Sequence, residues 1–284
     1  MKNGIKVLFA TDFSPCADNA LKYGLDFVKK FQSEFLVVHA YKTFNIVTDV
    51  RDYDKVKDQK NKIAAETEQE TSKACNIIHQ EAPEAPCKSV ALEGLPYKEI
   101  CKAAKENDVD LVVLGAKNSN ILERYLFGNT TAKVIENVQC PVLVVPQKSV
   151  FSPIKNIVYA CNLSENEIQK INQLTVLAEA YDAQLSIVNI YTGEQENNKV
   201  IFEEFKEKTL RVVNYPKIEW LTAQGNNVIE SLQHLVIDKH ADLLVVSAHV
   251  PVFLENLYRN SVTEGILKKL TLPLLVFHLD TEDT

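Results

Sequence analysis

Long apolar runs and clustered basic residues are both missing from this sequence. Nowhere do eighteen apolar residues follow one another, and the apolar run near the N-terminus is short and interrupted by Asp12. The sequence therefore predicts neither a membrane-spanning helix nor a signal peptide. The formal net charge of -7 and the lack of a basic stripe argue against nucleic acid as the main partner, because nonspecific binding to phosphate backbones depends on clustered Lys and Arg.

Cysteine motifs are missing as well. The six cysteines are scattered along the chain, and no two of them have C-x-x-C spacing. This pattern predicts no zinc site, and it is typical of thiols in a reducing compartment that mostly serve as small buried hydrophobes. We therefore expect a cytoplasmic protein without a metal site.

Signatures of several enzyme classes are also absent. The sequence contains no G-x-S-x-G, no H-E-x-x-H, no Walker G-x-x-x-x-G-K-[ST], and no Ser-Gly-Gly loop after its first predicted strand. No nucleophile stands beside a recognisable base. The sequence thus predicts a binding protein with no catalytic residues.

Predicted strands and helices alternate along the first half of the chain. Strands are predicted over residues 5–10, 35–40 and 89–92, and a long, charged and solvated helix over 52–80. Ser14 is a good N-cap for the helix that follows the first strand. Such alternation predicts an α/β fold with a parallel, doubly wound sheet.

Residues 110–145 form the most informative stretch, DLVVLGAKNSNILERYLFGNTTAKVIENVQCPVLVV. An apolar run stops at Gly115, as a strand buried on both faces does before a turn. Small polar residues at 128–131 precede a helical pattern that ends near Asn137, and a last strand is predicted over 142–145. The first turn of such a helix has free backbone N–H groups, which attract phosphate.

The order of elements then repeats. IKNIVYACNLS at 154–164 matches IKVLFATDFS at 5–14, with Ala160 opposite Ala10 at a displacement of 150 residues, and Pro273 matches Pro141 at a displacement of 132. The second copy is therefore 18 residues shorter, in the region where the first copy has its long charged helix. A repeat this regular predicts two tandem domains, residues 1–147 and 153–280, each with a five-stranded Rossmann-like sheet.

The spacing of glycines and polar residues after the fourth predicted strand resembles a known signature. Gly115, Asn118, Gly128 and the polar pair that follows are similar to the G-x2-G-x9-G-[S/T] nucleotide motif of the universal stress protein family, and CPVLVVP is a frequent ending for its domains. Asn118 replaces the middle glycine and Asn129 replaces Ser or Thr. Asparagine tolerates positive φ better than other non-glycine residues, so the loop shape remains accessible. The alternative is a plain surface loop.

The resemblance implies a site for an adenine nucleotide, ATP with or without magnesium, across the carboxyl ends of the first and fourth strands. Carried over by position, Asp12 beside Thr11 would face the adenosine and Ala40 would lie beside the base. The phosphates would lie between two groups of residues: Gly115, Lys117 and Asn118 on one side, and Gly128, Asn129 and Thr130 on the other. The alternatives are that Asp12 only caps a helix and that Lys117 is a solvated loop lysine.

The second copy differs at the matching positions. Its counterparts of Asp12, Gly115, Lys117, Asn118, Gly128 and Asn129 are Asn162, Ser247, His249, Val250, Asn260 and Ser261. Val250 is β-branched and precedes Pro251, and both features disfavour the loop shape. We therefore expect nucleotide in the first domain only. His249 has no second histidine at ligand spacing, so it is interpreted as a structural or surface histidine, as are His39, His240 and His278.

The resemblance implies a stress-response protein that acts through a protein partner. A nucleotide-free scaffold with vestigial loops and a slow ATPase are the alternatives. The closing strands of the two copies, 142–145 and 274–277, would each leave an open sheet edge, so we expect them to pair and form an internal pseudo-dimer. A further homodimer is left open, and the sequence names neither the stress nor the partner.

Overall fold

The computed structural model describes residues 4–42, 53–116, 128–191, 195–225, 228–248 and 272–278. In the first half the strands are β1 (Lys6–Ala10), β2 (Glu34–Tyr41), β3 (Cys87–Glu93), β4 (Leu111–Ala116) and β5 (Val142–Pro146). The helices between them are α1 (Pro15–Phe31), α2 (Tyr53–Glu81), α3 (Pro96–Glu106) and α4 (Gly128–Asn137). The predicted alternation of strands and helices is confirmed, with boundaries that differ by one or two residues.

The second half repeats the strand order. Its strands are β6 (Asn156–Ala160), β7 (Gln184–Tyr191), β8 (Ile218–Gln224), β9 (Leu243–Ala248) and β10 (Leu274–His278). Its described helices are α5 (Asn166–Tyr181), α6 (Gln195–Leu210) and α7 (Val228–Asp238). Helix α6 has 16 residues where α2 has 29, which accounts for most of the length that the second copy lacks.

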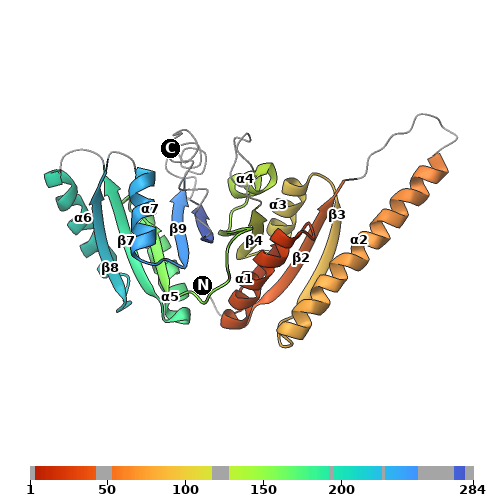
Figure 1. Ribbon diagram of the computed structural model, residues 1–284, viewed down its shortest axis with the longest axis horizontal. Helices are drawn as coiled ribbons and strands as arrows, with labels where there is room; N and C mark the ends of the chain where they lie inside the picture. Colours follow the sequence, from red (N-terminus) through yellow and green to blue (C-terminus); the bar gives the residue numbers. More distant parts are fainter. Residues whose placement is uncertain are drawn as a thin grey trace.

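All ten strands belong to one sheet, in the order β3-β2-β1-β4-β5-β10-β9-β6-β7-β8 (Figure 1). Within each half, neighbouring strands run parallel. The halves join where β5 and β10 pair antiparallel, with Leu275 opposite Leu143. The prediction that the closing strands pair is confirmed. Because the join is antiparallel, the carboxyl ends of the strands lie at opposite edges of the sheet in the two halves.

Helices cover both faces of the sheet, as the doubly wound prediction requires. In β1, Val7 and Phe9 contact the cluster that contains α1, whereas Leu8 and Ala10 contact the cluster that contains α3 and α4. The α1 cluster continues without a break into α5 of the second half. Alternate residues of each strand thus serve two cores, and one of these cores spans both halves.

Contacts between α1 and α5 also connect the two halves on that face of the sheet. The hydroxyl of Tyr181 donates a hydrogen bond to the carboxylate of Asp26 over 2.7 Å, and its ring lies 5.9 Å from the ring of Phe27. The ammonium group of Lys30 lies over the ring of Tyr181. Sheet pairing and helix packing therefore fix the two halves together.

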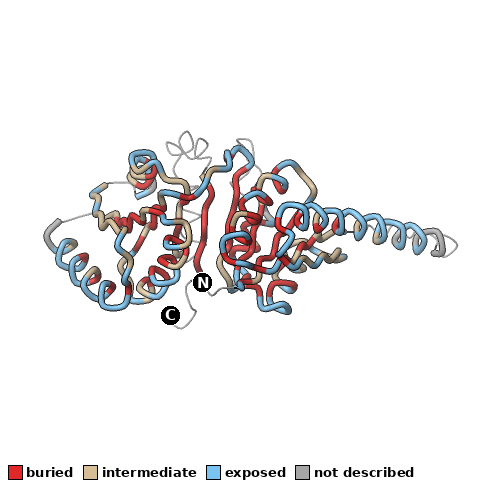
Figure 2. Tube along the Cα trace, turned by 90° about the horizontal axis from the view of Figure 1, so that it is seen from below, coloured by how far each residue is buried: buried red, intermediate tan, exposed pale blue. Residues whose placement is uncertain are grey.

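Helix α2 extends beyond the sheet (Figure 1) and is exposed along most of its length (Figure 2). Its last third packs against β3, where Cys75 of α2 forms a disulfide with Cys87 of β3. The cysteine pattern predicted thiols in a reducing compartment, and this disulfide removes that argument for the compartment. The cysteine spacing did not predict this disulfide, because the packing of α2 on β3 brings the two residues together.

The remaining cysteines, Cys16, Cys101, Cys140 and Cys161, are free. Burial raises the pKa of Cys101 to about 11 and those of Cys140 and Cys161 to about 12, so these three thiols stay protonated at neutral pH. Their interpretation as small apolar residues agrees with that. Within the described ranges, no helix combines the length and the apolar character that crossing a membrane requires.

Candidate nucleotide site

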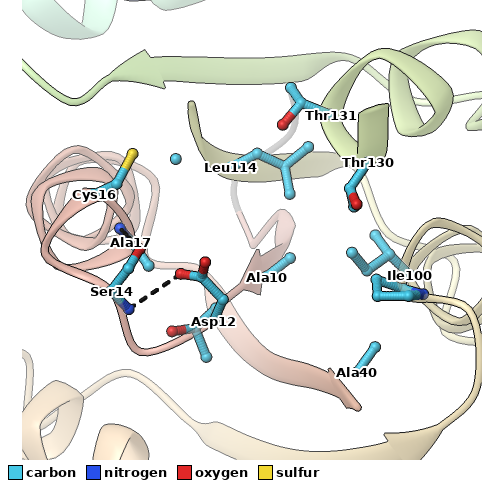
Figure 3. Close-up of a pocket in the computed structure, with 13 residues that line it drawn as sticks. Ala10, Asp12, Ser14, Cys16, Ala17, Ala40, Ile100, Leu114, Thr130 and Thr131 are labelled. Carbon is cyan, nitrogen blue, oxygen red and sulfur yellow. Dashed lines mark hydrogen bonds between the residues drawn. The ribbon is translucent and has the colours of Figure 1, made fainter. Parts of the chain in front are cut away.

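A cavity of about 340 Å³ opens at the carboxyl ends of β1 and β4 in the first half (Figure 3). This volume lies in the range of small-molecule pockets. The cavity is lined by Ala10, Thr11, Asp12, Ser14, Cys16, Ala17, Ala40, Pro96, Ile100, Leu114, Gly115, Thr130 and Thr131. It lies where the strand order of a doubly wound sheet reverses, because β2 and β3 are added on one side of β1 and β4 and β5 on the other.

The turn between β1 and α1 is held by its own side chains. Thr11 Oγ1 accepts a hydrogen bond from the backbone N–H of Phe13, and Asp12 Oδ1 accepts one from Ser14 over 3.0 Å (Figure 3). Ser14 in turn caps α1 by accepting from Ala17, which confirms the predicted N-cap. Phe13 has a φ of 55°, in the left-handed region that residues other than glycine seldom adopt. The bonded turn holds this strained residue in place.

The second half builds the same turn with an amide in place of the carboxylate. Asn162 Oδ1 accepts from the backbone N–H of Ser164 over 2.9 Å, and Leu163 has a φ of 64°. The turn therefore needs an oxygen acceptor but no negative charge. Asp12 does support the start of α1, as the alternative interpretation held, but Asn162 shows that the turn can form without its charge.

Gly115 is required by packing at the end of β4. A β-carbon at this position would lie 2.7 Å from the carbonyl oxygen of Cys16 and 2.8 Å from its carbonyl carbon. The backbone of α1 therefore occupies the space that a side chain would need. Packing against the first turn of α1 is therefore enough to require a glycine here, and its predicted place beside a phosphate stays a prediction.

Helix α4 supplies the opposite wall of the cavity. It begins at Gly128, as predicted, and its first N–H groups have no acceptor within the helix. Thr130 and Thr131, in that first turn, line the cavity, and Figure 3 shows Thr130 and Asp12 on either side of the same space. A helix start combined with hydroxyl groups suits an anionic group such as phosphate.

Most of the predicted site residues come together. Thr11, Asp12, Ala40, Gly115 and Thr130 line the cavity. Gly128 and Asn129 lie in the first turn of α4, but their side chains are outside the described part of the structure. Lys117 and Asn118 lie outside the described residues, as do His249, Val250, Pro251, Asn260 and Ser261 in the second half.

Sequence reasoning missed the apolar wall that α3 provides. Pro96 and Ile100 line the cavity opposite Asp12, and Ile100 is almost fully buried. The spacing of apolar residues in α3 can indicate a buried helix face that includes Ile100, but it does not show that this end of the helix borders a cavity. A flat apolar wall beside Ala40 suits the face of an aromatic base.

The position that corresponds to this cavity in the second half contains buried polar groups. Tyr159, Glu167 and Ser247 stand where the first half has Phe9, Ala17 and Gly115. The hydroxyl of Tyr159 donates to the Glu167 carboxyl and lies 3.0 Å from Ser247 Oγ. Burial raises the pKa of Glu167 to about 7, although the Ser247 hydrogen bond and the charge of Lys170 oppose this effect. Tyr159 and Glu167 have no exposed surface.

The structural interpretation of His39 is supported by its counterpart in the second half. His39 Nδ1 lies 2.7 Å from the carbonyl oxygen of Thr11, and Asn189 donates to the carbonyl of Cys161 at the matching position. Because a carbonyl only accepts, Nδ1 of His39 carries a proton and donates it. Across the described residues, no group of three or more His, Cys, Asp or Glu side chains could hold a metal ion.

Comparison with known proteins places this geometry in a family. The sequence model of the universal stress protein family matches residues 5–146. Universal stress protein MJ0577 from Methanocaldococcus jannaschii is 28% identical over 155 residues, which cover 51% of this chain and 96% of that protein. Universal stress protein MJ0531 from the same organism is 30% identical over 144 residues, covering 49% of this chain and 81% of that protein.

Solved structures extend the likeness in fold to the second half. A universal stress protein from Archaeoglobus fulgidus aligns with a TM-score of 0.69 at 15% identity, covering 98% of this chain and 97% of that one. One from Pseudomonas aeruginosa aligns with a TM-score of 0.62 at 14% identity, covering 96% and 92%. The family model, the two relatives and the shared fold agree, and the chain belongs to the universal stress protein family.

Proposed function

We propose that the first half binds one adenine nucleotide, ATP, and that the chain acts as a nucleotide-responsive regulator through a protein partner. The observation that carries this proposal is the cavity at the carboxyl ends of β1 and β4, with a carboxylate on one wall and a helix start on the other. These two walls match the two ends of a nucleotide. Hydroxyl and amino groups of adenosine donate hydrogen bonds, and phosphates accept them.

The orientation of the nucleotide follows from the same walls. The carboxylate of Asp12 lines the cavity, and a carboxylate can accept hydrogen bonds from ribose or base donors. The base would lie between Ala40 and the apolar wall of Ile100, and the phosphates would lie at the start of α4. Mg²⁺, where it accompanies ATP, is held largely by the phosphates and by water.

Binding without catalysis is the role that the lining residues support. Among the described residues that line the cavity, Asp12 is the one carboxylate, and none is a histidine or a lysine. Activation of a water for attack on a phosphate needs a base at the phosphate end, whereas Asp12 lies on the wall opposite α4. We propose that the first half binds the nucleotide without hydrolysing it and that a protein partner recognises the nucleotide-bound form.

One nucleotide per chain is part of the proposal. Glu167 stands where the first half has the small Ala17, so a carboxyl group fills the matching space in the second half. A carboxylate there would repel a phosphate, and a protonated carboxyl would still occupy the volume. Glu167 alone would therefore keep a phosphate out of the second half, whatever the effect of Val250.

The test is to identify and count the ligand. Mass spectrometry of material released by denaturing the freshly purified protein should show ATP or ADP, and calorimetric titration of the emptied protein should give one site per chain. An absence of both bound and titratable nucleotide would favour the nucleotide-free scaffold. Phosphate release above the background of an Asp12→Asn variant would favour the slow ATPase.

A further inference from the structure

The position of helix α4 decides the shape of one end of the cavity, because Thr130 and Thr131 lie in its first turn. The helix has only ten residues. Isolated helices of this length are not stable in water, because the first turn is unfavourable in free energy and a short helix forms too few hydrogen bonds to offset it. Contacts with the rest of the protein must therefore hold α4, and a contact at one end affects the order of the whole helix.

The second half supplies such a contact at the C-terminal end of α4. The last four carbonyl groups of a helix have no partner within it, and that of Ile135 is one of them. Nε2 of His278 forms a hydrogen bond with this carbonyl. Because the carbonyl can only accept, Nε2 carries the proton and donates it. Histidine near the end of a helix is a recognised partner for these carbonyls.

The sheet places His278 at this point. Strand β10 runs antiparallel to β5, with Val276 opposite Val142, so the carboxyl end of β10 emerges beside the start of β5. The chain reaches the start of β5 directly from α4. Ile135 is fully buried, and Nδ1 of the same imidazole is shielded from water. Water therefore cannot readily replace the bond if the imidazole is removed.

We infer that His278 is a positioning residue for the nucleotide cavity, through which the second half fixes the end of α4 and so holds Thr130 and Thr131 in place. The matching position in the first half is Pro146, which has no side-chain donor. The bond therefore acts in one direction, from the second half to the first. The second half thus has a role at the site although its own cavity position is filled.

The inference rests on the proposed function for the identity of the ligand, but its effect on α4 can be measured without one. We would compare His278→Leu, which removes the donor, with His278→Gln, whose amide nitrogen can reach the place of Nε2. We expect His278→Leu to weaken ATP binding about fivefold, which corresponds to one hydrogen bond of about 1 kcal/mol. His278→Gln should bind within about twofold of the wild type.

Hydrogen exchange of the ATP-free proteins provides the second readout. Amides of residues 132–137 should exchange faster in His278→Leu than in the wild type and the glutamine variant, while amides of β6 serve as an internal reference for global stability. Faster exchange with unchanged ATP affinity would make the bond merely structural and overturn the inference. Equal loss of affinity in both variants would overturn it too.

Failure of the proposed function would be recognised separately. If the wild type binds no ATP by calorimetry, the exchange comparison alone decides whether His278 holds α4. Slow exchange in the wild type and the glutamine variant, with fast exchange in His278→Leu, would support the link between the halves. Equal exchange in all three proteins would refute it.

Discussion

At the scale of single residues, Asp12 and Asn162 allow a carboxylate and an amide to be compared at matching positions of the two halves. Both accept the backbone N–H two residues later, over 3.0 and 2.9 Å, and both precede a residue with positive φ. The local structure is the same, so the difference between carboxylate and amide has no structural cause in the turn. What distinguishes the two residues is the cavity, which borders Asp12.

Replacing Asp12 with Asn should therefore separate binding from stability. The turn should persist, because Asn162 forms the same turn, and the free energy of unfolding should change by less than about 0.5 kcal/mol. ATP affinity should fall about tenfold or more, because hydrogen bonds to a charged acceptor are worth about 1.5–3 kcal/mol. Chemical denaturation and calorimetric titration measure the two effects, with Asn162→Asp as the matched control. Equal affinity in Asp12→Asn and wild type would remove Asp12 from the site.

Glu167 predicts a pH dependence of stability. Its pKa is about 7 in the folded protein and near 4.5 in the unfolded chain. Folding therefore keeps the group protonated between pH 4.5 and 7, where the unfolded chain ionises. The stability associated with this group is complete below pH 4.5, decreases by about 3 kcal/mol as the pH rises to 7, and then stays constant.

Glu167→Gln isolates that effect. The variant keeps the size of the side chain but does not titrate, so its free energy of unfolding should exceed that of the wild type increasingly between pH 5 and 7. Urea denaturation at half-unit pH steps measures the difference, with Glu165→Gln as a control on an exposed carboxylate nearby. A constant difference across this pH range would mean that Glu167 is ionised in the folded protein.

The residues that sequence reasoning placed correctly are those whose role depends on local geometry. Thr11, Asp12 and Ser14 follow a strand and precede a helix, and this order alone determines their turn. Gly115 was placed correctly at the end of the fourth strand, but the packing that requires a glycine there was not predictable, because its close neighbour Cys16 lies 99 residues away in the chain. Ile100 was missed as a site residue because a spacing pattern identifies a buried face without showing what lies at its end.

At the scale of elements, the long helix was predictable from the sequence, whereas its disulfide was not. Charge and sparse apolar residues were enough to predict α2 over residues 52–80, and the structure has it at Tyr53–Glu81. Its link to β3 depends on how the helix crosses the strand, which composition does not encode. Cys75 is buried and Cys87 begins the strand that forms the edge of the sheet.

Loss of this disulfide should loosen α2. Its cysteines are 12 residues apart, and a loop of about this length is expected to stabilise the folded state by about 2–3 kcal/mol under oxidising conditions. Cys75→Ser should lower the free energy of unfolding by that amount and accelerate hydrogen exchange in residues 71–81. Cys101→Ser is the control, because Cys101 is free. If wild type and Cys75→Ser have equal stability without reductant, the two cysteines are not joined in solution.

At the scale of the whole molecule, the antiparallel join of β5 and β10 determines the arrangement. It was predictable because each half ended in a short apolar strand that would otherwise form an exposed edge. The shared core beneath the join, which runs from α1 to α5, was not predictable, because no pattern shows which helices of two domains meet. Together they predict that the halves unfold as one cooperative unit.

We therefore expect the native chain to unfold in one calorimetric transition, with equal calorimetric and van't Hoff enthalpies. Leu275 is fully buried at the join, opposite Leu143. Leu275→Lys buries an unpaired charge there and should cost more than about 4 kcal/mol, enough to separate the halves. The variant should then melt in two transitions, whereas Leu275→Ile should keep one.

Adding ATP to Leu275→Lys should show which of its two melting transitions belongs to the half that binds the nucleotide. A ligand raises the melting temperature only of the unit that binds it. The gain in that unit's free energy of unfolding is RT ln(1 + [L]/Kd), about 2.7 kcal/mol at a hundredfold excess over Kd. If the first half binds the nucleotide, ATP should shift one of the two transitions of Leu275→Lys and leave the other in place. A shift of both would show that the second half also binds nucleotide, despite Glu167. Two transitions in the native chain would instead show that the join and the shared core do not couple the halves.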